Sequence, residues 1–248
     1  MVIDKIKDWI NLGELFNVKE KILISRKELP KHIAMTTAIV PNEENYKDLY
    51  QKKLERVITI VRTAIAMNVP ILTFDIMKET EMEYQIIDPL VLFFKELKNS
   101  EFIIQNQIKI AVLGKWYDLP GRLVEEIKGV INSTKDFDRH FVNLCINYDG
   151  QQEIVDALKL IGMQVMVGKV DPSTIDRETV KENLYSSQFL PPDLFIKTGS
   201  RQVLHGLLLW DSASATIYFT QKSWLDFDRT ALFKEIEFYQ NQDETKDL

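Results

Sequence analysis

The stretch FVNLCINYDGQQEIVDALKLIGMQVMVG (Phe141–Gly168) decides the fold. Its first part, Phe141–Tyr148, is a short and mostly apolar run, which predicts a buried strand. The residues from Gln151 to about Gly168 are predicted to form a long helix directly after it. A strand that runs straight into a helix is the repeating unit of α/β folds with a parallel sheet.

The same alternation extends to both sides of this stretch. Tyr46–Met67 has apolar side chains at helical spacing, and we expect a helix there; further helices are predicted at Asp88–Leu97 and Leu119–Ile131. Strands are predicted at Ile33–Thr37, Ile71–Met77, Ile108–Leu113 and Asp193–Thr198, while Leu207–Trp210 and Ile217–Thr220 close the ordered part. The pattern indicates a single α/β domain, with a mostly parallel open sheet and helices on both faces.

Composition narrows the class of protein. The chain has 248 residues, of which 45% are hydrophobic and 27% charged, as in an ordinary globular domain. Its formal net charge of −6 argues against a nucleic-acid partner, which would favour a basic surface. Cys145 is the single cysteine, so no internal disulfide is expected. No apolar run reaches membrane-spanning length and no secretory signal stands at the N-terminus, so we expect a cytoplasmic protein, with peripheral membrane contact as an option.

The two ends of the chain differ from the predicted domain at 29–240. Residues 1–28 form a predicted helical extension, with Ile3, Ile6, Trp9 and Ile10 on one face. That face fits either a membrane-surface helix or, as the mixed charges opposite it favour, a helix packed on the domain. Residues 241–248 are polar and are predicted to fray as a tail.

Several segments resemble undecaprenyl diphosphate synthase and its relatives, the cis-prenyltransferases. The most specific is LPPDLFIKTGSRQVLHGLLLWDSASATIYFTQKSWLDFD (Leu190–Asp228), which follows the family's C-terminal block. LPKHIAMTT (Leu29–Thr37) resembles the family's first strand, and VNLCINYDGQQEIVDA (Val142–Ala157) is similar to its Asn-Tyr-Gly-Gly-Arg helix start. The resemblance runs from about Leu29 to Tyr239. It implies an α/β fold with a deep apolar tunnel, an obligate dimer and synthesis of polyprenyl diphosphate from isopentenyl and allylic diphosphates.

The family's chemistry needs a carboxylate that holds Mg²⁺ and arginines that clamp diphosphate oxygens. In the first loop the family has Asp-Gly-Asn-x-Arg-Trp, whereas this chain has Ala38 at the Asp position, Ile39 at the Gly position and Asn42 at the Arg position. Glu43 and Glu44 are expected in the first turn of the following helix, capped by Asn42, where they would oppose a phosphate. The acidic run Glu79, Glu81 and Glu83 in the second loop fits a solvated loop better than a metal cluster.

The later family positions are also changed. Gln151 and Val203 replace arginines, and Thr216 replaces a metal-binding glutamate. Asn147 is kept, Lys197 keeps only the charge of an arginine, and Arg201 occupies a glutamate position, so these residues are the residual substrate-binding candidates. Asp149 with Gln152 resembles a capping box, which would make this loop serve its helix. No catalytic or metal-binding residue is expected in this chain.

The chain keeps the sequence pattern of the family's fold but lacks the residues that the family's chemistry needs. In this it resembles the non-catalytic, Nogo-B-receptor-like subunit of a heteromeric cis-prenyltransferase. The implied partner is a catalytic subunit whose own active site holds Mg²⁺, and the product is a precursor of glycosyl carrier lipids. The usual Arg-x-Gly tail of such subunits is missing here. Two alternatives remain open: a diverged homodimeric enzyme with a metal site rebuilt from Asp75, Glu79 or Asp118, and a module that binds a prenyl lipid in the tunnel. The expected interface residues, for which core burial is an equal alternative, are Trp210, Ile217, Tyr218, Phe219 and Trp224.

Overall fold

The computed structural model describes residues 28–39, 45–78, 84–204 and 206–243. Its strands are β1 (His32–Thr36), β2 (Ile71–Lys78), β3 (Ile108–Leu113), β4 (His140–Tyr148), β5 (Leu194–Lys197) and β6 (Thr216–Phe219). Its α-helices are α2 (Tyr46–Ala66), α3 (Tyr84–Lys98), α4 (Glu101–Gln105), α5 (Gly121–Thr134), α6 (Gly150–Met166), α7 (Arg177–Glu182) and α8 (Arg229–Asp243). Short 3₁₀ turns occupy Trp116–Asp118, Pro172–Thr174, Asp211–Ser214 and Trp224–Asp226. The predicted extension at 1–28 lies almost wholly outside the described residues.

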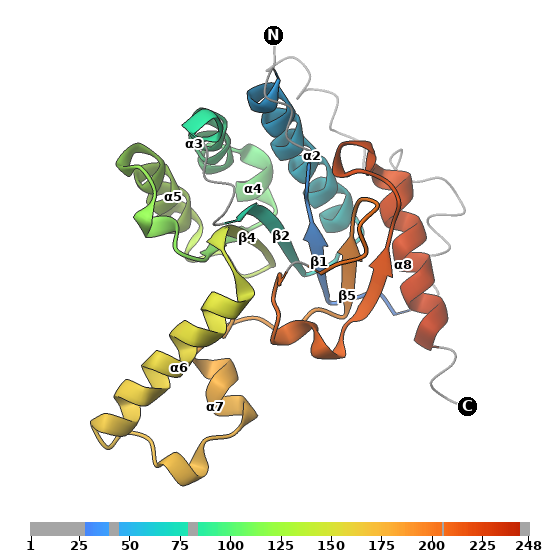
Figure 1. Ribbon diagram of the computed structural model, residues 1–248. Coiled ribbons are helices and arrows are strands. Elements are labelled where there is room, and N and C mark those ends of the chain that lie inside the picture. The colour runs from blue at the N-terminus through green and yellow to red at the C-terminus, as the bar shows by residue number, and fades with distance from the viewer. Residues whose placement is uncertain (1–27, 40–44, 79–83, 205, 244–248) are drawn as a thin grey trace.

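The six strands form one sheet in the order β3-β4-β2-β1-β5-β6, and every neighbouring pair is parallel. Each strand is entered from a helix or loop that returns along the outside of the sheet, as an α/β alternation requires. Figure 1 shows α2, α3, α5 and α8 beside the sheet, while α6 and α7 project away from the body. The predicted single-domain α/β fold is therefore confirmed.

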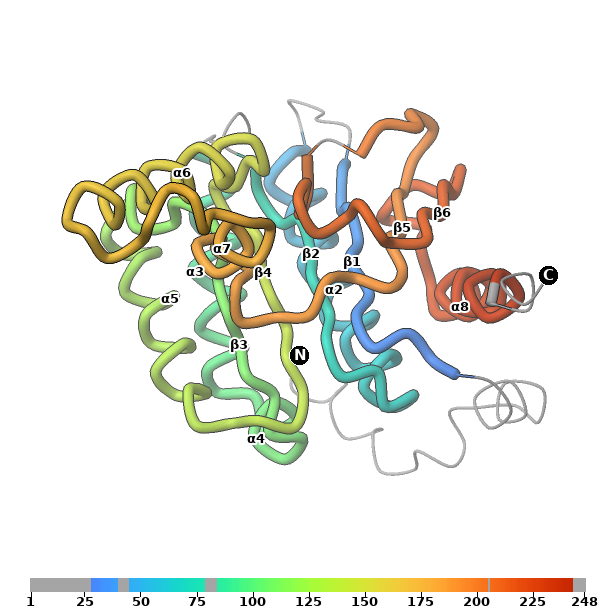
Figure 2. Tube along the Cα trace, turned by 90° about the horizontal axis from the view of Figure 1, so that it is seen from below, coloured from blue at the N-terminus to red at the C-terminus, as the bar shows by residue number. Residues whose placement is uncertain are grey.

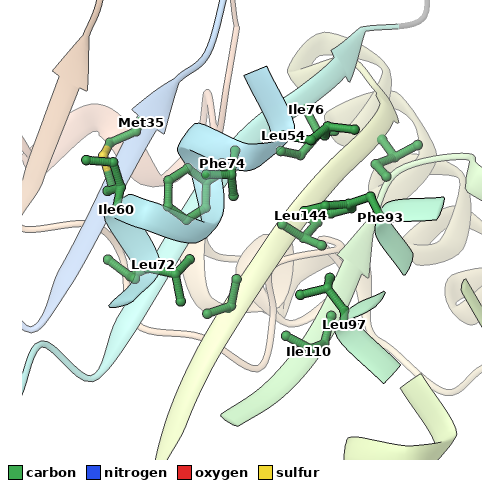
Figure 3. Packing of buried hydrophobic residues seen from close by; sticks show 14 of the residues in the cluster. Met35, Leu54, Ile60, Leu72, Phe74, Ile76, Phe93, Leu97, Ile110 and Leu144 are labelled. Carbon is green, nitrogen blue, oxygen red and sulfur yellow. The ribbon is translucent and has the colours of Figure 1, made fainter. Parts of the chain in front are cut away.

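The main core lies between the sheet and α2, α3, α5 and α8. Tyr50, Leu54, Val57 and Val61 follow the predicted helical spacing of α2 and are all buried. Figure 3 shows their neighbours, where Phe74 and Leu144 from the strands meet side chains of α2 and α3. Met35, Ile60, Leu72, Phe74 and Ile76 each have 0% exposure, so no water-sized space touches them. This part of the interior is packed with the chain's own side chains.

The opposite face of the sheet carries a smaller apolar cluster, including Ala34, Cys145 and Phe195. In Figure 2, the chain that follows α7 crosses in front of the sheet on this side. Its Phe189 and the buried turn residues Leu207 and Leu208 cover the cluster. Burial raises the pKa of the Cys145 thiol well above its usual range, as expected for an inert core cysteine.

The structure differs from the sequence prediction at several boundaries. Leu207–Trp210 is a turn, in which Leu208 has φ of 44°. The ordered part does not end at Thr220, because α8 follows and includes three residues of the predicted tail, Asn241–Asp243. The short helices α4 and α7 were not predicted, since five and six residues are too few for a visible apolar period. In the described ranges, no helix has the length and apolar character needed to cross a bilayer.

The edge strand β6 is held against α8 by a buried acid. Tyr218 stacks edge-on against Phe238 with ring centroids 4.8 Å apart, and its hydroxyl hydrogen-bonds to Glu235. Glu235 is 3% exposed, and its Oε2 has no hydrogen-bond partner among the described residues. Burial raises the pKa of this carboxyl from 4.5 to about 7.

We expect Glu235→Gln to remove a pH-dependent loss of stability. Because the folded state holds the Glu235 proton more tightly than the unfolded state, the wild-type free energy of unfolding should fall as pH rises from about 5 to about 7. The variant should gain about 1–3 kcal/mol over wild type between these limits, measured by urea unfolding. Glu237→Gln on the same helix is the control and should show no such gain. Parallel pH profiles for wild type and Glu235→Gln would contradict the assignment.

Candidate functional site

All strands are parallel, so their carboxyl ends gather at one edge of the sheet, where ligands bind in folds of this kind. The residues found at this edge are Thr37 and Ala38 after β1, Lys78 at the end of β2, Asn147 and Tyr148 at the end of β4, and Lys197 and Thr198 at the end of β5. Each can be compared with the sequence expectation.

The loop after β1 offers no metal ligand from a side chain at position 38. Ala38 is half-buried and ends in a methyl group, and Ile39 packs against the main core. The hydroxyl of Thr37 donates a short hydrogen bond to the backbone carbonyl of Asp75, which ties this loop to β2. The start of this loop is therefore fixed to the neighbouring strand.

The next helix, α2, begins at Tyr46, as the sequence predicted. Asn45 is the residue before α2, and its side chain makes no capping hydrogen bond. The acidic residue in the first turn of the helix is Asp48. Asn42, Glu43 and Glu44 lie outside the described residues, as do Glu79, Glu81 and Glu83.

The end of β2 brings an acid and a base together. Asp75 is 5% exposed, and its Oδ2 lies 3.8 Å from the Nζ of Lys78. The register pairs Lys78 with Tyr148 of β4 after a shift at Met77. Lys78 was not a candidate from the sequence. The sequence does contain a signal that could have identified Lys78, because it is a lysine at the end of the mostly apolar strand ILTFDIMK.

Two of the three acids offered for a rebuilt metal site, Asp75 and Asp118, are described by the structure. Asp118 is exposed on the turn after β3, and Glu79 is outside the described residues. Among the residues that the structure describes, no group of three or more His, Cys, Asp and Glu side chains is placed to hold a metal ion.

Asn147 connects the end of β4 to the loop after β3 through hydrogen bonds. Its φ is 50°, its Nδ2 donates to the carbonyl of Lys115 at 3.0 Å, and its own carbonyl accepts from the Lys115 amide at 3.1 Å. These bonds commit the amide nitrogen to the loop after β3. Its Oδ1 is buried without a partner among the described residues. The contacts of Asn147 thus support the loops rather than a residual role in holding phosphate.

The helix start after β4 is capped from one side only. Asp149 accepts from the amides of Gln151 and Gln152, both at 2.9 Å, as the capping prediction requires. The Gln152 side chain donates instead to Asp156, at 2.9 Å, so the reciprocal half of a capping box is not formed. Gln151, at the lost arginine position, is exposed.

Lys197 is the most unusual residue at this edge. It is 2% exposed, and its Nζ donates a short hydrogen bond to the carbonyl of Thr198. Burial lowers the pKa of its ammonium, the positive charges of Lys78 and Arg201 lower it further, and Asp75 opposes them. Arg201 and Val203 are exposed on the loop that follows.

The strand register places Lys197 close to Asp75. Thr36 of β1 pairs with Asp75, and the pairing of Met35 with Ile196 sets Thr36 level with Lys197. Asp75, Thr36 and Lys197 are therefore abreast on three adjacent strands and share one face of the sheet. Strand spacing puts the outer two Cα atoms about 10 Å apart.

Thr216 does not belong to this edge. It is the first residue of β6 and pairs with Leu194, the first residue of β5, which in turn pairs with Ile33. Thr216 is thus at the amino ends of the strands, whereas Ala38 follows their carboxyl ends. Within this chain, positions 38 and 216 are therefore at opposite edges of the sheet.

The predicted interface residues divide between surface and core. Trp224 has 0% exposure, stacks on Phe227, and donates its indole N–H to the carbonyl of Lys53 at 3.0 Å. Its core alternative is the correct one, so it cannot contact a partner. Trp210, Ile217 and Tyr218 are half-buried, and Phe219 is 36% exposed on the edge strand.

Sequence reasoning also missed a buried polar network behind the turn at 206–211. The Tyr148 hydroxyl donates to Glu153 at 2.5 Å and accepts from the Leu208 amide at 3.1 Å. Asp211 accepts from Lys181 at 2.7 Å and from the Ser186 hydroxyl at 2.6 Å. Gly150 permits this packing, because a Cβ there would lie 1.9 Å from the carbonyl oxygen of Gly206. The network fixes the turn against α6 and α7.

Residues 41–246 match a family model described as "Putative undecaprenyl diphosphate synthase". The chain therefore belongs to this family, the cis-prenyltransferases. The resemblance to this family, which was inferred mainly from the C-terminal block, is therefore confirmed as family membership.

Two archaeal relatives are similar over nearly the whole chain. A tritrans,polycis-undecaprenyl-diphosphate synthase (geranylgeranyl-diphosphate specific) of Methanocaldococcus jannaschii is 28% identical, over 98% of this chain and 92% of the relative. The protein of the same name from Thermoplasma acidophilum is 29% identical, over 93% and 95%.

Solved structures support the fold. Lavandulyl diphosphate synthase from Lavandula x intermedia, in complex with dimethylallyl diphosphate, superposes with a TM-score of 0.77 at 21% identity, over 86% of this chain and 95% of that one. A probable undecaprenyl diphosphate synthase from Campylobacter jejuni gives a TM-score of 0.68 at 22% identity, over 86% and 96%.

Proposed function

We propose that this chain is a non-catalytic subunit of a heteromeric cis-prenyltransferase, and that it supports a catalytic subunit that makes polyprenyl diphosphate. The observation that carries the proposal is Ala38. It follows β1 at the carboxyl edge of the sheet, where the family has the aspartate of Asp-Gly-Asn-x-Arg-Trp. A methyl group supplies no oxygen to a metal.

The other residues at this edge do not fit magnesium either. Mg²⁺ takes oxygen ligands in near-octahedral geometry and is usually held by carboxylates together with substrate phosphates. The nearby carboxylate, Asp75, is within 3.8 Å of the Lys78 ammonium and feels the charge of Lys197. Among the described residues at this edge, two cations thus stand beside one acid, which opposes a divalent cation. We accordingly expect Mg²⁺ in the partner's active site.

The surface of α6 supports association with a second chain. Val155, Leu158, Gly162 and Met166 lie at helical spacing on one face, here called the α6 face. Val155 is 44%, Leu158 54% and Met166 86% exposed, on a helix that stands out from the body (Figure 1). Gly162 has nothing within 4 Å of a built Cβ, so a neighbouring helix could approach closely at its position.

Further apolar side chains of α6 are exposed outside the α6 face. Leu160, Met163 and Val167, which point to another side of the helix, are each at least 43% exposed. Large exposed apolar patches mark interaction sites in soluble proteins. The partner we propose is a relative that keeps the Asp-Gly-Asn-x-Arg-Trp motif.

A diverged homodimeric enzyme is the second candidate. The names of the archaeal relatives favour it, because those proteins are called synthases and align over almost the whole chain.

The packed core weighs against a module that carries a prenyl lipid. Isoprene units between α2, α3 and the sheet would have to displace side chains such as Met35 and Phe74, which have 0% exposure.

We expect the purified chain alone to turn over no isopentenyl diphosphate. The assay supplies Mg²⁺ with farnesyl or geranylgeranyl diphosphate and measures radiolabelled polyprenyl products. A mixture with a motif-complete relative from the same genome should be active and should co-elute on size exclusion. Ala38→Asp is the matched control. Activity of this variant without a partner would show that the missing metal ligand at position 38 alone explains the lack of turnover. Robust turnover by the unmodified chain would favour the homodimeric enzyme.

We expect Leu158→Glu and Met166→Glu to weaken pairing with that relative by about a hundredfold, because each places a charge in an apolar contact. The dissociation constant is measured by analytical ultracentrifugation or interferometry. Ile104→Glu is the control, since Ile104 is 53% exposed on α4 and lies outside the α6 face. Circular dichroism should show the same fold for all three variants. Equal affinities for the α6 variants and the control would show that the α6 face is not the interface.

A further inference from the structure

Glu235, on α8, is a buried acid without a neutralising partner. It is 3% exposed, and its Oε2 has no hydrogen-bond partner among the described residues. The Tyr218 hydroxyl of β6 bonds to the carboxyl, and no described cation forms an ion pair with it. A buried carboxylate without a cation costs far more free energy than a buried neutral carboxyl, because a full charge loses its hydration. The folded position therefore favours the protonated form.

The charges that act on Glu235 do not offset its burial. Burial raises the pKa of this carboxyl to about 7, against the opposing effects of Tyr218, Lys234 and Lys222. Lys222 follows β6 and is already paired with Asp228, 3.2 Å away, while Lys234 is an exposed residue of α8. Both lysines therefore influence the carboxyl from a distance rather than by contact.

The other elements packed against α8 bring no closer charge. The helix lies next to the edge of the sheet formed by β5 and β6 (Figure 2), and β5 contributes apolar side chains of the main core. From α2, Lys53 and Arg56 contact the turn at 224–226. Arg229, at the start of α8, lies over a neighbouring aromatic ring. None of these three cations shifts the pKa of Glu235.

Glu235 also divides α8 into two parts that differ in burial. Before it, Ala231, Leu232 and Phe233 are buried in the main core. After Ile236 the side chains are half-buried or exposed as far as residue 242, with Gln240 as the exception. In this second part Phe238 stacks edge-on against Tyr218, with ring centroids 4.8 Å apart. Segments with few buried apolar contacts open locally at a lower free energy than the whole domain.

We propose that Glu235 and Tyr218 form a proton-dependent switch, which holds residues 237–243 of α8 against β6 when the carboxyl is protonated and lets them open locally when it is ionised. Opening brings water to the carboxylate and so hydrates its charge. The first part of α8 stays in the main core, so the domain keeps its fold. This regulation goes beyond the supporting role and does not depend on a partner.

The direction of the pH effect follows from linkage. Glu235 holds its proton more tightly when the helix end is closed than when it is open and hydrated. The closed form is therefore most favoured at about pH 5 and below, near the ordinary pKa of a glutamate. Its advantage decreases as pH rises and levels off above about pH 7.

The test is hydrogen–deuterium exchange of the full chain between about pH 5 and pH 8, read by mass spectrometry and corrected for the intrinsic pH dependence of exchange. Protection of residues 237–243 should fall by about tenfold or more across this range in wild type. In Glu235→Gln it should stay constant, because the amide does not titrate. Glu237→Gln, on the same helix, is the control and should follow wild type. Peptides from α5 serve as the internal reference and should not change.

A second variant, Tyr218→Phe, separates a switch from a merely structural contact. The hydrogen bond from Tyr218 lowers the pKa of Glu235, so its removal should raise that pKa further. The decrease in protection should then extend to a higher pH than in wild type. A contact that only holds the helix in place would instead lower protection equally at every pH.

Three outcomes would overturn the proposal. They are equal protection of residues 237–243 at pH 5 and pH 8 in wild type, the same decrease in Glu235→Gln as in wild type, and a transition in Tyr218→Phe that does not move to higher pH. Circular dichroism checks the fold of each variant, and the wild-type and Tyr218→Phe profiles still decide the matter if Glu235→Gln does not fold. Because the chain is measured alone, failure here leaves the subunit role standing, and failure to pair leaves the switch standing.

Discussion

The parallel register of β2, β1 and β5 is the constraint on which the rest of the site depends. It sets Asp75, Thr36 and Lys197 abreast, with Lys78 three residues beyond Asp75. One acid and two lysines are thereby held at the strand ends in surroundings that are nearly dry. In such surroundings charge decides what can bind, since the interaction of two charges is several-fold stronger than in water. The proposal that this chain does not hold magnesium depends on that arrangement.

The threonines at the strand ends reinforce that arrangement. Thr37 donates to the carbonyl of Asp75. Thr198 donates its hydroxyl to the carbonyl of Thr36 at 2.8 Å and its amide to the Thr36 hydroxyl at 3.1 Å. Buried backbone groups at these strand ends are satisfied by neighbouring side chains rather than by a ligand shell. The fold of a cis-prenyltransferase is thus maintained while the loop after β1 holds no metal ligand at position 38.

Much of the fold was accessible from the sequence, and the site less so. The strand Ile108–Leu113 was predicted at its observed bounds, because a continuous apolar run flanked by polar residues signals a buried strand. The C-terminal block identified the family without any structure. Register was inaccessible, because it arises from pairing between distant segments. For that reason Lys78 was overlooked, and Trp224 could not be assigned to core or interface.

The central claim is that this chain offers magnesium no site beside Ala38. Its most direct test is a crystal soaked with Mn²⁺ and a non-hydrolysable analogue of isopentenyl diphosphate, with anomalous diffraction recorded for manganese. The account predicts no anomalous peak at the carboxyl ends of β1 and β2. An anomalous peak there, bridging the analogue and Asp75, would contradict it.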